Sequence, residues 1–161
     1  MATLLPPDMV AFMAKGVSVI VGSRAADLRP SVMRAVGSRI EDAGRTITVY
    51  LSRRQSRQLL QDLAATGQIA VVFSVPSTHR SVQVKASRVA TRPAGHDDVA
   101  VLDAYLHAME DEIQLVGFPP PLTRAMLAHS LDDLVAVTFT PEQAFEQTPG
   151  PRAGTALGGK P

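Results

Sequence analysis

The stretch that decides the fold is IAVVFSVPSTHRSVQVKA, residues 69–86. Its first half is apolar in the middle, which is typical of a central strand, and it stops at the turn residues 76–78. From Ser81 the pattern alternates, with Val82 and Val84 on one face and polar side chains on the other. The stretch therefore predicts two adjacent antiparallel strands joined by a short turn.

The rest of the chain adds strands and helices around this pair. Alternation and β-branched runs predict strands at 17–22, 31–40, 46–52, 68–75, 81–91 and 134–140. The strand at 46–52 is expected to be half-buried, with Thr46, Thr48, Tyr50 and Ser52 on its polar face. Helical spacing predicts helices at 56–66, where Gly67 is the expected C-terminal cap, and at 97–115 and 122–129. Strand–helix–strand alternation is missing, which favours an antiparallel barrel, closed or split.

Length and composition predict one domain. A chain of 161 residues with 45% apolar content buries one core, and we expect a domain over 1–147 followed by a Gly- and Pro-rich, mobile tail over 148–161. The sequence has no cysteine and no apolar run of about eighteen residues, so we expect a cytoplasmic protein without disulfides, thiolate chemistry or a membrane segment.

Charge is unevenly distributed along the chain. Residues 24–92 contain twelve Lys or Arg and four acids, whereas residues 97–146 contain ten acids and one Arg. One interpretation is two solvated faces of opposite sign. The other is an anion-binding site formed by the middle third of the chain.

Four segments in this order resemble the FMN-binding split-barrel proteins related to pyridoxamine 5'-phosphate oxidase. They are residues 30–36 (PSVMRAV), 49–52 with Ser56 and Arg57 after them, 69–73, and 80–86. The resemblance extends from about residue 17 to residue 89 and includes the strand at 135–139. It implies a mainly β, six-stranded antiparallel split barrel with peripheral helices, which binds FMN at the interface of a homodimer.

The same resemblance implies which residues bind the cofactor. The matching positions are Arg34, Val36, Arg39, Ser52, Ser56, Arg57, Ser81, Gln83 and Lys85. Two physical arguments, independent of the resemblance, support an anion site at some of these residues. An arginine within an apolar strand, such as Arg34, needs an anion or an acid if it is buried. A helix that starts near Ser56 offers free N–H groups to a phosphate. The alternatives are a surface ion pair for Arg34, a solvated turn for Arg57, and the barrel exterior for Gln83 and Lys85.

Two positions depart from the oxidase-type motif: Gln58 stands where that motif has lysine, and Ala86 where it has glycine. Residues that would recognise pyridoxal phosphate are missing as well. We therefore expect an FMN-dependent oxidoreductase with an unidentified small substrate, not a vitamin B6 oxidase, and we assign no catalytic residue. The alternatives are a haem-binding or haem-handling split-barrel protein and a non-catalytic flavin-binding stress module.

Other ligands are disfavoured by the sequence. It has no Gly-x-Gly-x-x-Gly turn for a dinucleotide, so we expect FMN and not FAD. The absence of tryptophan and of a recognised motif disfavours nucleic acid. His96, His107 and His129 lack metal-ligand spacing, so no metal is expected. His79 follows the turn at 76–78 and is either a contact to substrate or flavin, or a solvated side chain.

Overall fold

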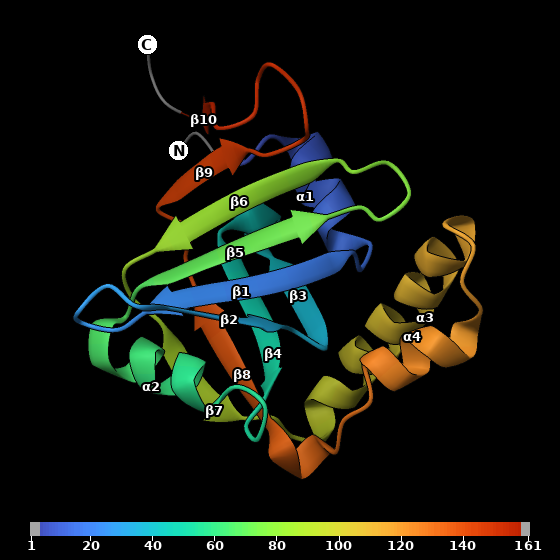
Figure 1. The fold of residues 1–161 in the computed structure, drawn as a ribbon, viewed down its shortest axis with the longest axis horizontal. Helices are drawn as coiled ribbons and strands as arrows, with labels where there is room; N and C mark the ends of the chain where they lie inside the picture. The colour runs from blue at the N-terminus through green and yellow to red at the C-terminus, as the bar shows by residue number, and fades with distance from the viewer. Residues whose placement is uncertain (1–3, 159–161) are drawn as a thin grey trace.

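The computed structural model describes residues 4–158, which form four α-helices and ten β-strands (Figure 1). The helices are α1 (Pro7–Ala14), α2 (Arg57–Thr66), α3 (Val99–Leu115) and α4 (Pro120–Met126). The first five strands are β1 (Ser18–Arg24), β2 (Pro30–Arg34), β3 (Gly37–Glu41), β4 (Thr46–Ser52) and β5 (Ile69–Ser74). The others are β6 (Ser81–Ala86), β7 (Ala90–Pro93), β8 (Leu134–Phe139), β9 (Gln143–Glu146) and β10 (Ala156–Leu157). The protein is mainly antiparallel β with helices, as its sequence predicted.

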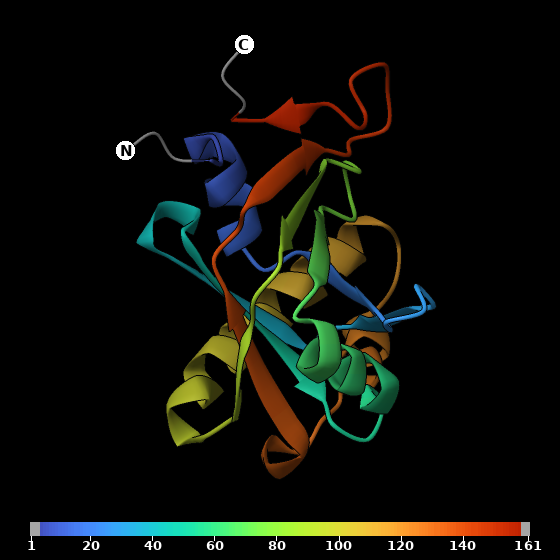
Figure 2. The same ribbon diagram turned by 90° about the vertical axis from the view of Figure 1, so that its left-hand side faces the viewer.

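The strands belong to two sheets. The six-stranded sheet has the order β10-β9-β6-β5-β1-β2, and the four-stranded sheet has the order β3-β4-β8-β7. Every strand pair is antiparallel. Figure 1 shows the strands of the smaller sheet crossing behind the larger one, with the α3–α4 hairpin standing to one side, and Figure 2 shows the same molecule turned by 90°.

The main core fills the space between the two sheets. Inward side chains of β1 and β5, such as Val19, Val71 and Phe73, are fully buried there together with Ile47 and Val49 of β4. The other face of each strand in the larger sheet is more open, because the residues that alternate with these core positions are only partly buried. The six-stranded sheet therefore has one face in the core and one outer face.

The number of strands differs from the prediction of six. The segment predicted as one strand over 31–40 is two strands, β2 in the larger sheet and β3 in the smaller sheet. Residues 81–91 likewise divide into β6 and β7, again in different sheets. Each segment bends where the chain passes from one sheet to the other, and alternation along the sequence contains no signal for that bend. Strands β9 and β10 were not predicted.

The prediction that β4 is half-buried is wrong. Its polar-face residues Thr48, Tyr50 and Ser52 are 2%, 0% and 7% exposed. Tyr50 lies in a second apolar cluster with Leu102 of α3 and Val36, Leu134 and Ala136. Helix α3 therefore covers the face of β4 that alternation alone assigned to solvent.

Helix α2 follows its prediction closely. It begins after Ser56 and ends at Gly67, which has a left-handed φ of 68° and donates its N–H to the Leu63 carbonyl at 2.9 Å. Helix α2 packs against β1 and β2, with Leu59 and Leu63 in the core.

The predicted tail returns to the larger sheet. The N–H of Ser81 donates to Thr148 Oγ1 at 3.0 Å, and Ala156 of β10 pairs with Phe145 of β9. Residues 159–161 of the predicted tail lie outside the described part of the chain.

Candidate functional site

The connection between β4 and α2 is built around a carboxylate. Ser52 donates its hydroxyl to Asp133 Oδ2 at 2.6 Å, and the Arg54 N–H donates to Asp133 Oδ1 at 3.2 Å. The Arg53 N–H bonds to the Asp133 carbonyl at 2.7 Å. This loop therefore binds an anion, but the anion is the side chain of Asp133. The predicted phosphate ligand Ser52 is already bound to it.

Ser56, the next predicted ligand, has a free hydroxyl. The residue is only 2% exposed, and its Oγ has no hydrogen-bond partner among the described residues. Its backbone is satisfied, because its N–H donates to the Ser52 carbonyl and its own carbonyl accepts from Leu60, each at 2.9 Å. A buried, unpaired hydroxyl costs about 1–3 kcal/mol. At the start of a ten-residue helix, whose first N–H groups have no partner inside the helix, an added anion would satisfy it.

The two residues after Ser56 differ in whether their side chains are free to bind a ligand. Arg57 is exposed and forms no ion pair within residues 4–158. Gln58 donates its amide to Asp62 Oδ1 at 2.9 Å, and Ser31 donates its hydroxyl to Asp62 Oδ2 at 2.6 Å. Gln58, at the lysine position of the oxidase motif, thus orients Asp62 within α2, and the Ser31–Asp62 hydrogen bond links α2 to β2.

Arg34 lies at the end of β2, opposite Ile20 on the outer face of the larger sheet. Its Nη1 donates to Ser18 Oγ at 2.7 Å, and it contacts no carboxylate in the described part of the chain. A partly buried guanidinium whose side-chain partner is a neutral hydroxyl retains its capacity to bind an anion.

Val36 and Arg39 lie beyond the bend, in another environment. The Val36 side chain is 6% exposed in the cluster beneath α3, and its N–H donates to the Tyr50 carbonyl at 2.9 Å. The guanidinium of Arg39 lies 3.3 Å from Glu41 Oε2 and 3.9 Å from Asp98 Oδ1. The charge of Arg39 is therefore balanced inside the protein.

Asp98 is the centre of a buried polar network. Its carboxylate accepts two hydrogen bonds from Arg92 at 2.7 Å, one from Tyr50 Oη at 2.8 Å and one from the Gly95 N–H at 2.9 Å. The hydrogen bonds from Arg92 hold the Asp98 pKa well below its usual range. Burial, followed by the hydrogen bond to Asp98, raises the pKa of Tyr50 to about 12. The network joins β3, β4 and β7 to the start of α3.

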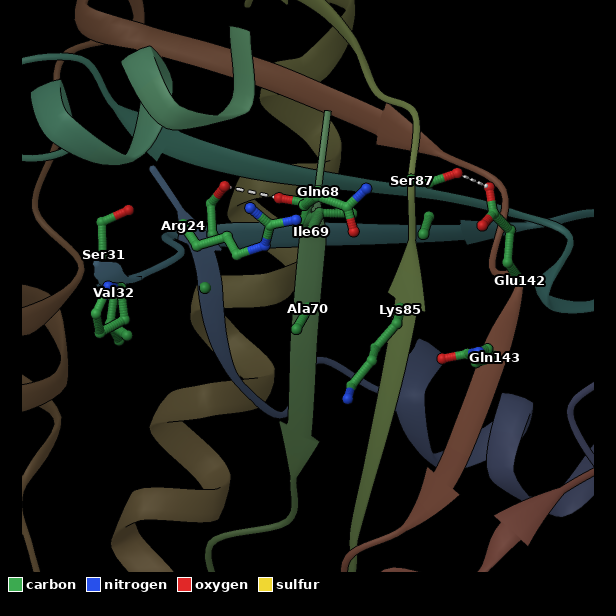
Figure 3. Close-up of a pocket in the computed structure, with 14 residues that line it drawn as sticks. Arg24, Ser31, Val32, Gln68, Ile69, Ala70, Lys85, Ser87, Glu142 and Gln143 are labelled. Carbon is green, nitrogen blue, oxygen red and sulfur yellow. Dashed lines mark hydrogen bonds between the residues drawn. The ribbon is translucent and has the colours of Figure 1, made fainter. Parts of the chain in front are cut away.

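The three remaining predicted residues lie on β6. Ser81 is 6% exposed; its hydroxyl shares a very short hydrogen bond with the Ser74 hydroxyl and donates to the His79 carbonyl at 2.9 Å. Gln83 and Lys85 are partly buried on the outer face of the larger sheet. Lys85 lines a groove of about 430 Å³ on that face (Figure 3). His79 is exposed in the turn before β6, with a φ of 61°.

The predicted residues therefore occupy separate places. Ser52, Ser56 and Arg57 meet at the start of α2, and Arg34 lies on the strand against which α2 packs. Gln83 is three strands away from Arg34 along the register Arg34–Ile20–Val72–Gln83, which corresponds to about 14 Å. Sequence reasoning missed Asp133 and Asp98, because their partners are 81 and 48 positions away and no local pattern links them.

Two further properties concern residues 4–158 as a whole. They contain no group of three His, Asp or Glu side chains placed to hold a metal ion. None of their helices combines the length and the apolar character needed to cross a membrane.

The solved structures that resemble the chain define its fold class. It has the split-barrel fold of the pyridoxamine 5'-phosphate oxidase-like proteins, which confirms the sequence prediction. One of them is a putative pyridoxamine 5'-phosphate oxidase from Lactobacillus delbrueckii, with 14% identity, coverage of 88% of this chain and 93% of that chain, and a TM-score of 0.55.

Two other solved structures have the same fold. HupZ of Group A Streptococcus has 14% identity, coverage of 96% of this chain and 100% of that chain, and a TM-score of 0.56. HutZ, the heme storage protein from Vibrio cholerae, has 13% identity, coverage of 89% and 95%, and a TM-score of 0.50. No protein-family model matches the sequence. No curated protein matches it either.

Proposed function

We propose that this protein binds FMN, works as an FMN-dependent oxidoreductase and does so as a homodimer. The observation that carries the proposal is the buried Ser56 hydroxyl, which lacks a partner at the start of α2. A phosphate group there accepts a hydrogen bond from this hydroxyl and from the free N–H groups of the first turn.

Two arginines are available to complete the phosphate site. Arg57 lies in the first turn of α2, and Arg34 lies at the end of β2, the edge strand against which α2 packs. Both are free of acid partners within residues 4–158, so each can form a charge-assisted hydrogen bond to a phosphate oxygen. The nearby Asp133 carboxylate is already compensated by Ser52 and the Arg54 N–H.

FMN, once bound, supplies hydride or electron transfer, and the protein supplies binding, orientation and electrostatics. The role assigned to Ser56, Arg57 and Arg34 is to fix the phosphate end of the molecule. That role needs no titrating acid or base near the phosphate. The split-barrel fold, shared with a protein described as a pyridoxamine 5'-phosphate oxidase, supports this proposal.

Haem binding is the second candidate, and it is favoured by the likeness to the heme storage protein HutZ. The histidines give it limited support. The Nδ1 atoms of His107 and His129 lie 2.7 Å and 2.9 Å from backbone carbonyls of their own segments. His79 and His96 are exposed.

The non-catalytic flavin-binding module is the third alternative. It is distinguished from an oxidoreductase by a lack of turnover with bound FMN.

Titration of the purified protein with FMN, riboflavin, FAD and haem tests the proposal. Riboflavin lacks the phosphate, so we expect FMN to bind at least about tenfold more tightly, given roughly 1.5–3 kcal/mol for a hydrogen bond to a charged group. Equal affinity for FMN and riboflavin would refute the phosphate site. Tight binding of haem without any binding of FMN would favour the second candidate.

A further inference from the structure

The outer face of the six-stranded sheet carries a groove whose floor lies one row along the strands from Arg34, because Gly22 pairs with Val32 and Ile20 pairs with Arg34. It lies over the ends of β2, β1, β5, β6 and β9 and has a volume of about 430 Å³ (Figure 3). A space of this size holds a small organic molecule. The groove touches neither Ser56 nor Arg57 of the proposed phosphate site, because neither residue lines it.

The strand register explains why a hollow forms there. Val32, Gly22, Ala70, Lys85 and Gln143 follow one another across five strands and share the outer face. The second and third positions of this row are glycine and alanine, whereas the next row has Ile20 and Val72 in the same places. A Cβ added to Gly22 would meet nothing closer than 3.7 Å. The groove floor is therefore flat and apolar because its central residues lack bulky side chains.

Two cations border this floor, and neither forms an ion pair in the described residues. Arg24 donates a 3.3 Å hydrogen bond to the carbonyl of Ala25, and Lys85 Nζ lies 5.0 Å from the centre of the Phe145 ring. Figure 3 shows Lys85 leaning from β6 toward Ala70, and Arg24 reaching from β1 toward Gln68 and Ile69. The two side chains therefore come from β1 and β6, the strands on either side of Ala70 in β5.

The one acid that lines the groove is held at its rim. Glu142 Oε1 accepts a hydrogen bond from the Ser87 hydroxyl at 2.8 Å, drawn as a dashed line in Figure 3. That hydrogen bond lowers the Glu142 pKa. Glu142 forms no ion pair with Arg24 or Lys85 in the described residues. Gln68 and Gln143 add amide groups to the same border.

We propose that this groove is a binding site for a flat organic anion, such as an aromatic carboxylate, separate from the phosphate site at α2. The ring of the ligand lies on Gly22 and Ala70, beside the exposed Val32, where it covers apolar surface. Its carboxylate lies between Arg24 and Lys85, which hold it by charge-assisted hydrogen bonds. In this proposal Lys85 binds a different ligand from the flavin that the sequence led us to expect.

The test uses 2-naphthoate as the probe, with 2-naphthalenemethanol and 2-naphthylmethylamine as matched neutral and cationic probes. Binding to the FMN-free protein is followed by amide chemical shifts. We expect 2-naphthoate alone to bind, with the largest shifts at Gly22, Ala70 and Lys85. Lys85→Met and Arg24→Met should each weaken binding about tenfold. Arg45→Met, at an exposed arginine between β3 and β4 that does not line the groove, is the control and should leave it unchanged.

A third groove variant and a competition experiment keep the test decisive. Gly22→Val fills the floor without removing a charge, so it should abolish binding if the ring lies there. Saturating FMN should leave the affinity for 2-naphthoate unchanged within about twofold. Absence of binding at millimolar probe, binding that ignores all three groove variants, or displacement of the probe by FMN would each overturn the separate site. Since the titration is run without FMN, failure of FMN to bind would refute only the proposed function.

Discussion

The residues at the start of α2 differ in whether their hydrogen-bonding groups are free to bind a ligand. The Asp133 carboxylate accepts hydrogen bonds from the Ser52 hydroxyl and the Arg54 N–H. Ser56, four residues after Ser52, keeps a buried hydroxyl without a partner in the described residues. The sequence indicated hydroxyl and arginine groups in this segment. It could not indicate which of them Asp133 would take, since that residue comes 81 positions after Ser52.

Arg34 is the first residue whose substitution we predict to matter. Arg34→Ala should raise the dissociation constant of FMN about tenfold, because it removes one charge-assisted contact worth roughly 1.5–3 kcal/mol. Riboflavin binding should not respond. Arg45→Ala, at an exposed arginine between β3 and β4, is a matched control. Isothermal titration calorimetry measures the affinities of wild type and both variants for FMN and riboflavin. Unaltered FMN affinity in a folded Arg34→Ala variant would remove Arg34 from the site.

Asp98 governs stability at low pH. Its pKa is lower in the folded protein than the unfolded value of about 3.9, so its contribution is fully present above about pH 4 and is lost as the pH falls through the folded pKa. Asp98→Asn should destabilise the protein by about 2 kcal/mol at pH 7, less than a fully buried pair would, because the Arg92 side chain is 46% exposed.

Urea unfolding of wild type and Asp98→Asn at pH 7 and at pH 3 checks this expectation. The difference in unfolding free energy between the two proteins should be smaller at pH 3. Asp97→Asn changes an exposed neighbour and should stay within about 0.5 kcal/mol of wild type. A difference that grows on acidification would contradict the role given to Asp98.

At the scale of elements, the sequence predicted the strands and helices with a local pattern and missed the places where strands change sheets. Helix α2 with its cap and the strands β4, β5 and β8 were all found in their expected positions. The divisions between β2 and β3 and between β6 and β7 were not, because both halves of each segment have strand-like alternation. The buried polar face of β4 was missed for a related reason, since Leu102 of α3, which packs with Tyr50, comes 52 positions later in the chain.

The cap of α2 provides an element-scale prediction. Gly67 has a φ of 68°, and a Cβ there would lie 2.6 Å from the Ser87 carbonyl oxygen. Gly67→Ala should destabilise the protein by about 2–3 kcal/mol, since the left-handed conformation costs about 1–2 kcal/mol and the backbone contact adds to it. Gly95→Ala is the control, because no atom lies within 4 Å of its added Cβ. Thermal unfolding compares them, and equal melting temperatures would contradict this account of the cap.

At the scale of the whole molecule, the two oppositely charged segments lie in different parts of the fold. The acidic segment 97–146 includes the α3–α4 hairpin, and the basic segment 24–92 includes three of the six strands of the larger sheet, β2, β5 and β6. Five of the seven large apolar side chains that are exposed in residues 4–158 lie at the end of this hairpin, namely Leu115, Val116, Phe118, Leu122 and Met126. Such concentration of exposed apolar surface is typical of an interaction site and supports the proposed homodimer.

Light scattering tests the homodimer. We expect a mass of about twice the 17.1 kDa of the chain at micromolar concentration. Phe118→Asp and Leu122→Asp together should shift the protein toward the monomer, because they place charges in the exposed apolar patch. Lys15→Asp changes charge outside that patch and serves as the control. A monomeric wild-type protein would remove the dimer from the proposal.

The most direct test of the central claim is a crystal structure of the protein with FMN bound. The account predicts phosphate oxygens within about 2.7–3.2 Å of Ser56 Oγ and of N–H groups in the first turn of α2, with an arginine at position 34 or 57 on the same phosphate. A phosphate bound elsewhere, for example beside Lys85 in the sheet groove, with Ser56 Oγ still unpaired, would contradict it.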